Sequence, residues 1–391
     1  MKENGDWRQE RAELLHNACT VVVKVGSAVL TADNGLDVSV LRDLACQMAR
    51  LACKPGGGKR RLILVTSAAV AAGRAMLAAH RGRLDISGLS ARQAVAAIGQ
   101  CQLMQAWDAA FRSCGMVTAQ ILLTRDDLRA RQRFLNVRNT FAELLEWEIL
   151  PIVNENDTVA VHELKFGDND SLACLLVNLA RADLFLNLTS APGVRSEDPQ
   201  KNPAAPILTH IDDIATLELT QMCGGKSLVG TGGMYSKLLA ARRAAQIGIP
   251  TLILPGREAG VLDKAFNPDS TIGTWIRPSA HAIPRRKFWL AYQSEPAGII
   301  HIDDGAAKAL LHGGGSLLPG GVRHVEGSFQ QGTLVRVSHS ERSLGVGLSN
   351  YSAGELRKIM GLKRHEVAAI LGDAHYPNVI HRDNLLLDAA V

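Results

Sequence analysis

Carboxylate and amide side chains are concentrated in one short stretch of the chain, PIVNENDTVAVHELKFGDNDSLA, at residues 151 to 173. Asn154, Asp157, Asn169 and Asp170 lie there between two apolar runs. Such side chains fix ammonium groups and hydrogen-bond to carboxylates, so the stretch is a candidate binding site. A turn rich in Asn and Asp that satisfies its own backbone is the alternative interpretation.

Two lysines stand where positive charge would meet a phosphate group. Lys24 lies near the end of the apolar run TVVVKV and precedes Gly26, and Lys237 ends the glycine-rich stretch GTGGMYSK. Glycines let backbone N–H groups approach phosphate oxygens, and a helix N-terminus favours negative charge. We expect both lysines at the rim of a phosphate site; for Lys24, a solvated surface lysine is the alternative.

Short β-branched runs alternate with alanine-rich helical segments up to about residue 275, which predicts one large α/β domain with a mainly parallel sheet. The helical segment at 90–115 carries one apolar stripe, and Asp170 or Ser171 is expected to cap the helix that follows GDND. The predicted strands lie at 20–25, 62–66, 118–123, 149–153, 184–188 and 251–254.

The loops after these strands should gather at one edge of the sheet, where sites in parallel sheets lie. Ser67 follows the second strand, NENDT the fourth and TSAPG the fifth. A plain helix N-cap is the alternative for Ser67. Five polar or glycine-rich loops meeting at one edge nevertheless favour a binding site.

The composition and the pattern of predicted elements change after residue 275. RPSAHAIPRRKFW has two prolines and a basic cluster, which is typical of a linker. The remainder is glycine-rich and β-like, so we expect a large domain at 1–285 and a small β-rich barrel at 286–391.

The composition is that of an ordinary globular protein, with 391 residues, 47% hydrophobic, 21% charged and a net charge of +5. This charge permits an anionic substrate or RNA and requires neither. The seven cysteines form no C-x-x-C pair, so reduced thiols are expected. Without an apolar leader or a run long enough to span a membrane, we expect no membrane contact and a cytoplasmic location.

Several stretches resemble the glutamate 5-kinases of the amino-acid kinase family, and the part after IIHIDDGAAKALL resembles a PUA domain. The resemblance covers nearly the whole chain, and NEND, GDND and GTGGM are its most specific pieces. It rests on VVVKVGSAVLT, LVTSAAVAAGR, QAVAAIGQCQLMQAW, LLTRDDLRARQRFLNVRNT, PIVNENDTVA, KFGDNDSLA and GTGGMYSKLLAA.

The resemblance implies a three-layer αβα fold and ATP-dependent phosphorylation of the γ-carboxylate of L-glutamate, the first step of proline biosynthesis. ATP would be the co-substrate, Mg²⁺ the accompanying ion and L-proline a feedback inhibitor. A homo-oligomer, dimer or tetramer, is also implied, and RNA binding by the PUA-like portion is left open.

The resemblance also implies roles for individual residues. Substrate binding would fall to Ser67, Asp157, Asn169 and Asn154. Catalysis would fall to Lys24 and Lys237, with Asp170 holding the lysines by charge pairing. No protein ligand for a metal is implied. The nucleotide would be bound by Lys24, Thr189, Ser190, Thr231, Gly232, Gly233, Met234, Tyr235, Ser236 and Lys237.

Two departures from the family pattern stand out. Ala68 occupies a position that is usually glycine, where a methyl group disfavours positive φ. Ser190 replaces the aspartate of the usual Thr-Asp pair, and a hydroxyl cannot supply a negative charge. We therefore expect changes in substrate placement and in nucleotide affinity.

Two other functions remain open from the sequence. A related kinase acting on aspartate or N-acetylglutamate would keep the same fold, and the NEND to GDND spacing speaks against it. An RNA-binding or regulatory protein with a degenerate kinase half would use the basic residues of the C-terminal portion. Scattered solvated charge is the simpler interpretation of those residues, because no aromatic array accompanies them.

Overall fold

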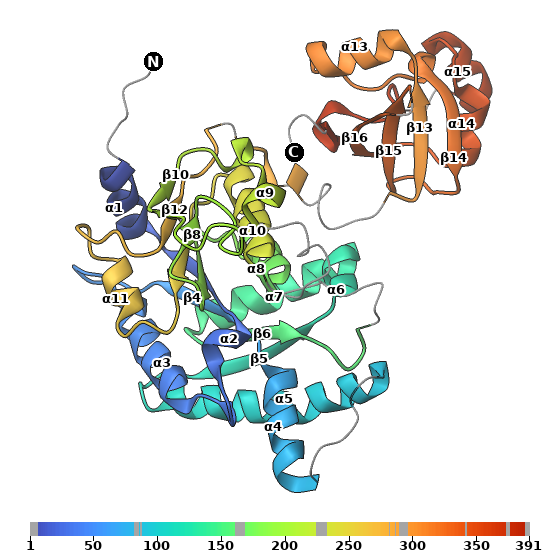
Figure 1. Cartoon of the computed structure of the whole chain (residues 1–391). Helices are drawn as coiled ribbons and strands as arrows, with labels where there is room; N and C mark the ends of the chain where they lie inside the picture. Colours follow the sequence, from blue (N-terminus) through green and yellow to red (C-terminus); the bar gives the residue numbers. More distant parts are fainter. Residues whose placement is uncertain are drawn as a thin grey trace. The chain divides into compact units, whose positions relative to one another are not determined.

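The computed structural model describes residues 7–81, 86, 88–160, 169–223, 233–280, 282–285, 287–288, 296–340, 342–372 and 376–387 (Figure 1). The chain forms two compact units, Met1–Ala282 and Ile283–Val391. Thr231 and Gly232, two predicted nucleotide residues, lie outside the described residues. Within the described part, no helix is long and apolar enough to cross a bilayer.

The first unit is built on an eight-stranded sheet with the order β10-β12-β11-β7-β1-β4-β6-β5. All neighbouring strands run parallel except β11 and β12, so the predicted mainly parallel sheet is confirmed. The strands are β1 (Thr20–Val25), β4 (Arg61–Val65), β5 (Thr118–Leu123), β6 (Leu150–Glu155), β7 (Leu184–Thr189), β10 (His210–Ile211), β11 (Thr251–Pro255) and β12 (Thr274–Ile276).

Helices cover both faces of this sheet, with α3 and α5 on one face and α8 and α10 on the other (Figure 1). The helices of this unit are α1 (Trp7–Asn17), α2 (Ser27–Leu30), α3 (Val38–Ala52), α4 (Ala69–Arg81), α5 (Leu89–Arg112), α6 (Arg125–Arg129), α7 (Arg131–Glu146), α8 (Asn169–Leu179), α9 (Leu219–Cys223), α10 (Met234–Gln246) and α11 (Val261–Ala265).

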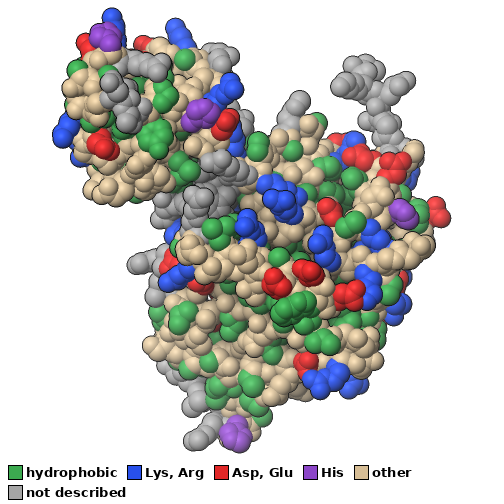
Figure 2. Space-filling view, turned by 180° about the vertical axis from the view of Figure 1, so that it is seen from behind, with side chains coloured by type: hydrophobic (Ala, Val, Ile, Leu, Met, Phe, Trp, Pro, Cys, Tyr) green, Lys and Arg blue, Asp and Glu red, His purple; other side chains and the backbone are tan. Residues whose placement is uncertain are grey.

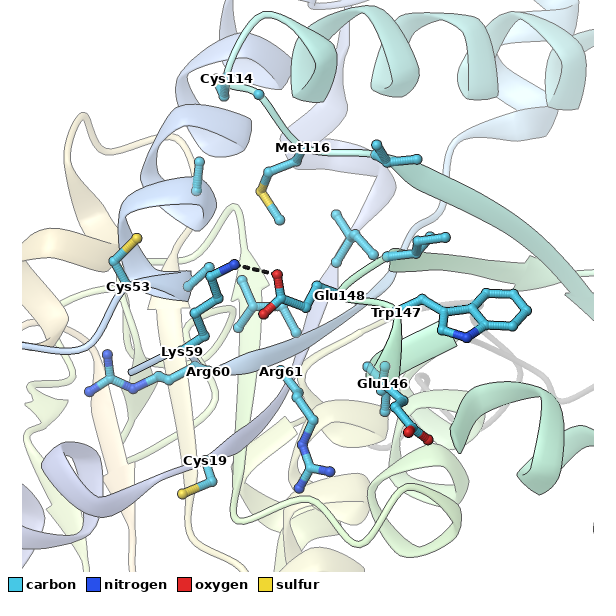
Figure 3. Close-up of a pocket in the computed structure, with 18 residues that line it drawn as sticks. Cys19, Cys53, Lys59, Arg60, Arg61, Cys114, Met116, Glu146, Trp147 and Glu148 are labelled. Atoms are coloured by element: carbon cyan, nitrogen blue, oxygen red, sulfur yellow. Dashed lines mark hydrogen bonds and ion pairs between the residues drawn. The ribbon is translucent and has the colours of Figure 1, made fainter. Parts of the chain in front are cut away.

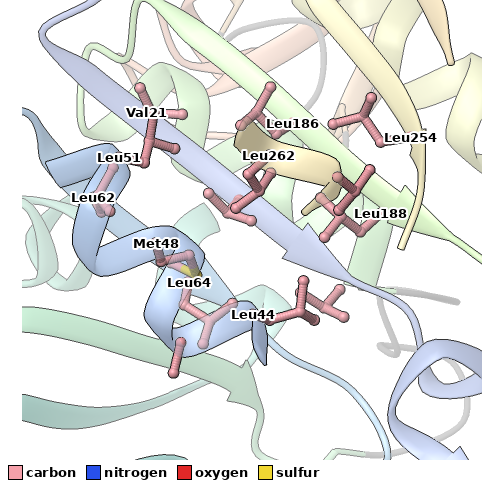
Figure 4. Close-up of a cluster of buried hydrophobic side chains, with 14 of the residues drawn as sticks. Val21, Leu44, Met48, Leu51, Leu62, Leu64, Leu186, Leu188, Leu254 and Leu262 are labelled. Carbon is pink, nitrogen blue, oxygen red and sulfur yellow. The ribbon is translucent and has the colours of Figure 1, made fainter. Parts of the chain in front are cut away.

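Successive side chains of β1 point to opposite faces of the sheet. Val21, Val23 and Val25 point into the apolar core beneath α3, which Figure 4 shows with Met48 and Leu64. Since successive side chains of a strand point to opposite faces, Lys24 points to the side of α8. The strand thus buries a lysine beside the helix that begins in the acidic stretch.

The predicted apolar stripe of α5 is confirmed, because Leu103, Trp107, Ala110 and Phe111 are all buried. The chain leaves this helix through Gly115, whose φ of +74° is a conformation that glycine adopts without a steric penalty. The predicted N-cap is wrong for both Asp170 and Ser171, because they are the second and third residues of α8. The Asp170 carboxylate instead contacts lysines from two other elements.

The second unit is a five-stranded mixed sheet with the order β14-β13-β15-β16-β17 around its own apolar core. This confirms the predicted β-rich C-terminal part. Its strands are β13 (Gly298–Ile302), β14 (Val322–Gly327), β15 (Leu334–His339), β16 (Arg342–Leu348) and β17 (Leu385–Leu387), and its helices are α13 (Asp304–Gly313), α14 (Ala353–Ile359) and α15 (Arg364–Leu371).

Candidate active site

A cavity of about 590 Å³ opens at the carboxyl ends of β1, β4, β6 and β7. The parallel order of these strands brings the loops that follow them to the same edge of the sheet. Eight predicted substrate, catalytic and nucleotide residues therefore line one space, and Asp170 contacts two of them. The eight are Lys24, Ser67, Asn154, Asp157, Asn169, Thr189, Ser190 and Lys237.

A buried carboxylate joins the two lysines. Asp170 Oδ1 lies 2.6 Å from Lys24 Nζ, and Asp170 Oδ2 lies 3.1 Å from Lys237 Nζ. Both lysines were expected at a rim, but they are only 2% and 4% exposed. Such burial of two cations requires a counter-charge, and Asp170 supplies it.

The ionised form of Asp170 is strongly favoured. Burial alone would raise its pKa, but the charges of Lys24 and Lys237 outweigh burial and lower the pKa to about 2. Asn187 Nδ2 donates to Oδ1 at 2.9 Å and Ser236 Oγ donates to Oδ2 at 2.8 Å. The carboxylate is therefore held in one orientation by four groups.

The lowered pKa of Asp170 predicts that the free energy of unfolding depends on pH in acid. Since its folded pKa lies below the ordinary value of 3.8, the ionised carboxylate contributes fully above that pH, and the contribution is lost as pH falls toward about 2. Urea unfolding at a series of pH values should show a constant stability gap between wild type and Asp170→Asn at neutral pH, narrowing below roughly pH 4. A gap that stays constant to roughly pH 2 would contradict this assignment.

A second network of amides surrounds Ser67. Asn169 Nδ2 lies 3.0 Å from Ser67 Oγ, 2.8 Å from Asn154 Oδ1 and 2.7 Å from the Thr66 carbonyl oxygen. Asn154 in turn donates to Gln100 Oε1 on α5 at 2.8 Å. The structure thus brings together three of the four predicted substrate residues through direct contacts, and Asp157 lines the same cavity.

The loop between β4 and α4 has a constrained backbone. Ala68 adopts a φ of +86°, which confirms that this position prefers glycine in conformational terms. Thr66 is buried, and its Oγ1 accepts a hydrogen bond from Trp107 Nε1 at 2.9 Å. The indole therefore holds the loop that presents Ser67 to the cavity.

We predict that Ala68→Gly stabilises the protein by about 1 kcal/mol, because glycine adopts positive φ without the steric strain of a methyl group. Thermal unfolding measures the change. Ala72→Gly is the matched control: Ala72 lies inside α4, and the same substitution there should destabilise by about 1 kcal/mol. A lower melting temperature for Ala68→Gly would show that its methyl packing outweighs the strain.

Two glycines allow α4 and α5 to cross closely behind Ser67. A Cβ built on Gly99 would lie 1.7 Å from the Ala69 carbonyl oxygen, and one on Gly73 would lie 2.0 Å from the Val95 carbonyl oxygen. Any side chain at either position would force the helices apart. The position of the Ser67 loop therefore depends on this crossing.

We predict that Gly99→Ala raises the KM for the substrate bound at Ser67 by about tenfold or more, because α4 must move away from α5. The apparent affinity for the nucleotide should change less, since its predicted loops lie on other elements. Steady-state kinetics with each substrate varied in turn measure both. Gly354→Ala, at a position with open space around it, is the control and should change neither constant.

The remaining nucleotide residues fall in two environments. Thr189 and Ser190 line the cavity at the end of β7, and Ser236 contacts Asp170. Met234 and Tyr235 instead pack against an apolar cluster that includes Leu238 and Ile253. Gly233 is the N-cap residue of α10, so the helix begins where the predicted phosphate loop ends.

Two polar residues of the site went unpredicted. Asn187 pairs with Lys24 in the register of β1 and β7, and its amide contacts Asp170. An asparagine inside the apolar run LFLNL was the available signal. Gln100 supports Asn154 from α5, and only the three-dimensional crossing of α5 and β6 reveals that contact.

The donor groups of the site determine how it could hold a metal ion. Asp170 is fully engaged by two lysines, Asn187 and Ser236. Among the described residues, no group of three or more His, Cys, Asp or Glu side chains is placed to hold a metal ion. The carboxylates of the cavity lining, Glu155 and Asp157, carry oxygen donors of the kind that Mg²⁺ accepts.

A larger cavity, of about 790 Å³, lies at the opposite edge of the sheet, where β1, β4, β5 and β6 begin (Figure 3). Lys59 and Glu148 form an ion pair across it, and Trp147 points away from that pair (Figure 3). Its lining includes none of the predicted site residues. Since sites in parallel sheets lie at the carboxyl ends of strands, the smaller cavity is the candidate active site.

Comparisons with known proteins agree with this geometry. The model of the amino acid kinase family matches residues 20–255, and the model of the PUA domain matches residues 298–371. A glutamate 5-kinase of Nitratidesulfovibrio vulgaris (strain DP4) is 58% identical over 387 residues, which is 99% of this chain and 100% of that protein. One from Oleidesulfovibrio alaskensis is 55% identical over 387 residues, again 99% and 100% of the two chains.

A more distant relative and a solved structure complete the comparison. A glutamate 5-kinase of Pelobacter propionicus is 44% identical over 380 residues, covering 96% of this chain and 100% of that protein. The solved substrate complex of an isopentenyl phosphate kinase aligns with a TM-score of 0.46 and 17% identity, covering 66% of this chain and 100% of that one. That structural likeness is too distant to support an inference.

Proposed function

Because the chain belongs to the amino acid kinase family and, within it, to the glutamate 5-kinases, we propose that its smaller cavity transfers the γ-phosphoryl group of ATP to the γ-carboxylate of L-glutamate. The products are L-glutamyl 5-phosphate and ADP, and the reaction opens proline biosynthesis. The observation that carries the proposal is that the buried side chains of Lys24 and Lys237 both form ion pairs with Asp170. The hydrogen bond between Asn169 and Ser67 lies in the same cavity.

The nucleophile needs no general base. A γ-carboxylate has a reference pKa near 4.3 and is ionised at neutral pH, so one of its oxygens attacks the γ-phosphorus directly. The bond from that phosphorus to the bridging oxygen breaks, and ADP leaves with the electron pair. The protein's task is alignment and charge neutralisation.

Lys24 and Lys237 supply the positive charge for two approaching anions. Their ammonium groups are fixed by Asp170 before substrates arrive, so little reorganisation accompanies the reaction. Charge stabilisation by a fixed donor is stronger in a buried site than in water. Asp170 is thus a positioning residue that supplies the counter-charge for both lysines.

The polar side chains that line the cavity select the substrate. Ser67 and Asn169 donate to substrate oxygens, while Asp157 accepts from the α-ammonium group. The nucleotide lies along Thr189, Ser190 and the start of α10, whose N-terminus favours phosphate. Mg²⁺ bound together with ATP would supply additional charge neutralisation beside Lys24 and Lys237.

Further features are proposed from the resemblance. L-Proline shares the α-carboxylate and cationic nitrogen of glutamate, so it should compete for the same pocket and raise the apparent KM for glutamate. Asp157→Asn should weaken the binding of both L-glutamate and L-proline.

The resemblance supports three more proposals. We propose a homo-oligomer and a cytoplasmic location. We also propose that residues 1–285 carry out catalysis and that residues 286–391 have an accessory role.

The basic side chains of the C-terminal unit are interspersed with acidic ones, which disfavours RNA binding. Arg323 pairs with Asp303 at 2.7 Å, and His301 contacts Glu326 at 2.7 Å. Figure 2 shows Lys and Arg side chains interspersed with Asp and Glu on the faces in view. Charge of mixed sign attracts a phosphate backbone weakly.

The proposed function is tested by incubating the purified full chain with ATP, Mg²⁺, L-glutamate and hydroxylamine. γ-Glutamyl hydroxamate should form together with ADP. L-Aspartate and N-acetyl-L-glutamate serve as the competing substrates, and each should give at most about a hundredth of the rate. Faster reaction with either would assign the cavity to that acid, and absence of any hydroxamate would refute the proposal.

A further inference from the structure

Two arginines in the candidate active site have no role in the reaction described so far. Arg74 on α4 and Arg92 on α5 line the same cavity as Lys24, Ser67 and Asp157. We propose that these two arginines bind the α-carboxylate of the substrate and make the enzyme specific for acids that carry a free one. This inference rests on the proposed function and names the part of the site that recognises the amino-acid end of glutamate.

The distribution of positive charge in the cavity leads to this assignment. Glutamate brings two carboxylates, and each requires a cationic or donor partner. Lys24 and Lys237 are both committed to Asp170, at the end of the cavity where the phosphoryl group transfers. Of the described cavity lining, only Arg74 and Arg92 supply further cationic side chains.

Both guanidinium groups are available to a ligand. Arg74 and Arg92 are exposed, and within the part of the chain that the structure describes neither has an ion pair or side-chain hydrogen bond. Arginine presents its N–H groups in a planar fork that matches both oxygens of a carboxylate. Ser67 and Asn169 are neutral donors, so once Asp157 holds the ammonium and the lysines meet the γ-carboxylate, the α-carboxylate is the charged group of glutamate that still lacks a counter-charge.

The helix crossing places both arginines on the substrate side. Val70 and Ala71, one turn before Arg74, also line the cavity, so Arg74 lies on the face of α4 that follows the Ser67 loop. On α5, Arg92 precedes Val95 by three residues, and the Val95 backbone is in close contact with Gly73. The same crossing that positions Ser67 therefore holds both arginines beside it.

The reacting end and the recognised end of the substrate thus have separate cations. The lysines act on the γ-carboxylate and the phosphates, where charge changes during the reaction. The arginines act on the α-carboxylate, whose charge stays constant, so their loss should affect binding more than turnover.

The test uses two substrates that differ only in the α-group. L-Isoglutamine keeps the γ-carboxylate and the α-ammonium of L-glutamate but has a carboxamide in place of the α-carboxylate. Hydroxamate formation gives kcat/KM for each, in wild type and in the variants Arg74→Gln, Arg92→Gln and the double variant. Arg61→Gln is the matched control, since Arg61 is an exposed arginine at the opposite edge of the sheet.

We expect wild type to prefer L-glutamate over L-isoglutamine by about a hundredfold or more, and the double variant to lose at least about tenfold of that preference. The loss should come from a higher KM for glutamate, with kcat and the isoglutamine constants nearly unchanged. Arg74→Lys with Arg92→Lys should retain part of the preference, because the charge remains while the fork is lost. Arg61→Gln should behave as wild type.

Two failures are distinguishable. If wild type forms no hydroxamate from either substrate, the proposed function itself is wrong. If wild type phosphorylates glutamate and the double variant keeps the full preference over isoglutamine, the arginines do not read the α-carboxylate and the inference is overturned. Equal losses for both substrates would also overturn it, since that result indicates a structural effect on the site.

Discussion

Replacing either active-site lysine with methionine is expected to lower kcat by at least about a hundredfold, because a preorganised donor of this kind is typically worth roughly 3 kcal/mol in the transition state. Methionine in Lys24→Met and Lys237→Met retains most of the side-chain volume, so no cavity forms at these buried positions. The hydroxamate assay at saturating ATP and glutamate measures the effect.

Each lysine variant leaves Asp170 with one cationic partner, so a moderate loss of stability should accompany the loss of turnover. Circular dichroism separates the two, since the variants should remain folded at the assay temperature. Lys59→Met is the matched control, because Lys59 forms an exposed ion pair at the opposite edge of the sheet. Retention of more than about a tenth of the wild-type kcat by a folded variant would show that its lysine does not stabilise the transferring group.

Asp170→Asn is expected to abolish measurable turnover and to lower the free energy of unfolding by about 3–5 kcal/mol. The amide has the size of the carboxylate but leaves two buried ammonium groups without a counter-charge. The two ammonium groups then repel each other without a counter-charge between them, so their positive charge is no longer held in place for the phosphoryl group. Urea unfolding and the hydroxamate assay on the same preparation measure both losses.

Asp183→Asn supplies the control for this variant. The Asp183 carboxylate accepts hydrogen bonds from the backbone N–H groups of Cys19 at 2.9 Å and Thr20 at 2.8 Å, at the opposite edge of the sheet. Its replacement should reduce stability and leave kcat unchanged. A stable and active Asp170→Asn enzyme would mean that the carboxylate does not organise the lysines.

Many residues of the candidate active site could be predicted from the sequence, because the loops that follow parallel strands lie at the same edge of the sheet. Lys24, Ser67, Asn154 and Asp157 each follow or end an apolar run, so their meeting at one edge follows from the sheet alone. The depth of the lysines could not be predicted in this way. It depends on the side-chain alternation of β1 and on the carboxylate of Asp170 one layer away.

The supporting contacts were harder to predict, because they join elements distant in sequence. The contact between Asn187 and Asp170 requires the register of β7 against β1, and the contact between Gln100 and Asn154 requires the crossing of α5 over the sheet. Gly99 gave no local signal, since a glycine inside a helix is also tolerated for other reasons. Its role becomes visible only through the 1.7 Å approach that a Cβ would make to the Ala69 carbonyl oxygen.

Direct attack of the substrate carboxylate on phosphorus is tested by L-glutamate labelled with ¹⁸O in both γ-carboxylate oxygens. The purified enzyme converts it in the presence of ATP, Mg²⁺ and hydroxylamine, which attacks the acyl carbon and releases phosphate. Mass spectrometry of that phosphate should find one ¹⁸O atom per molecule, because the attacking oxygen stays on phosphorus when the acyl bond breaks. Phosphate without ¹⁸O would contradict the mechanism, since the γ-phosphoryl group would then have passed to water instead of to the carboxylate of glutamate.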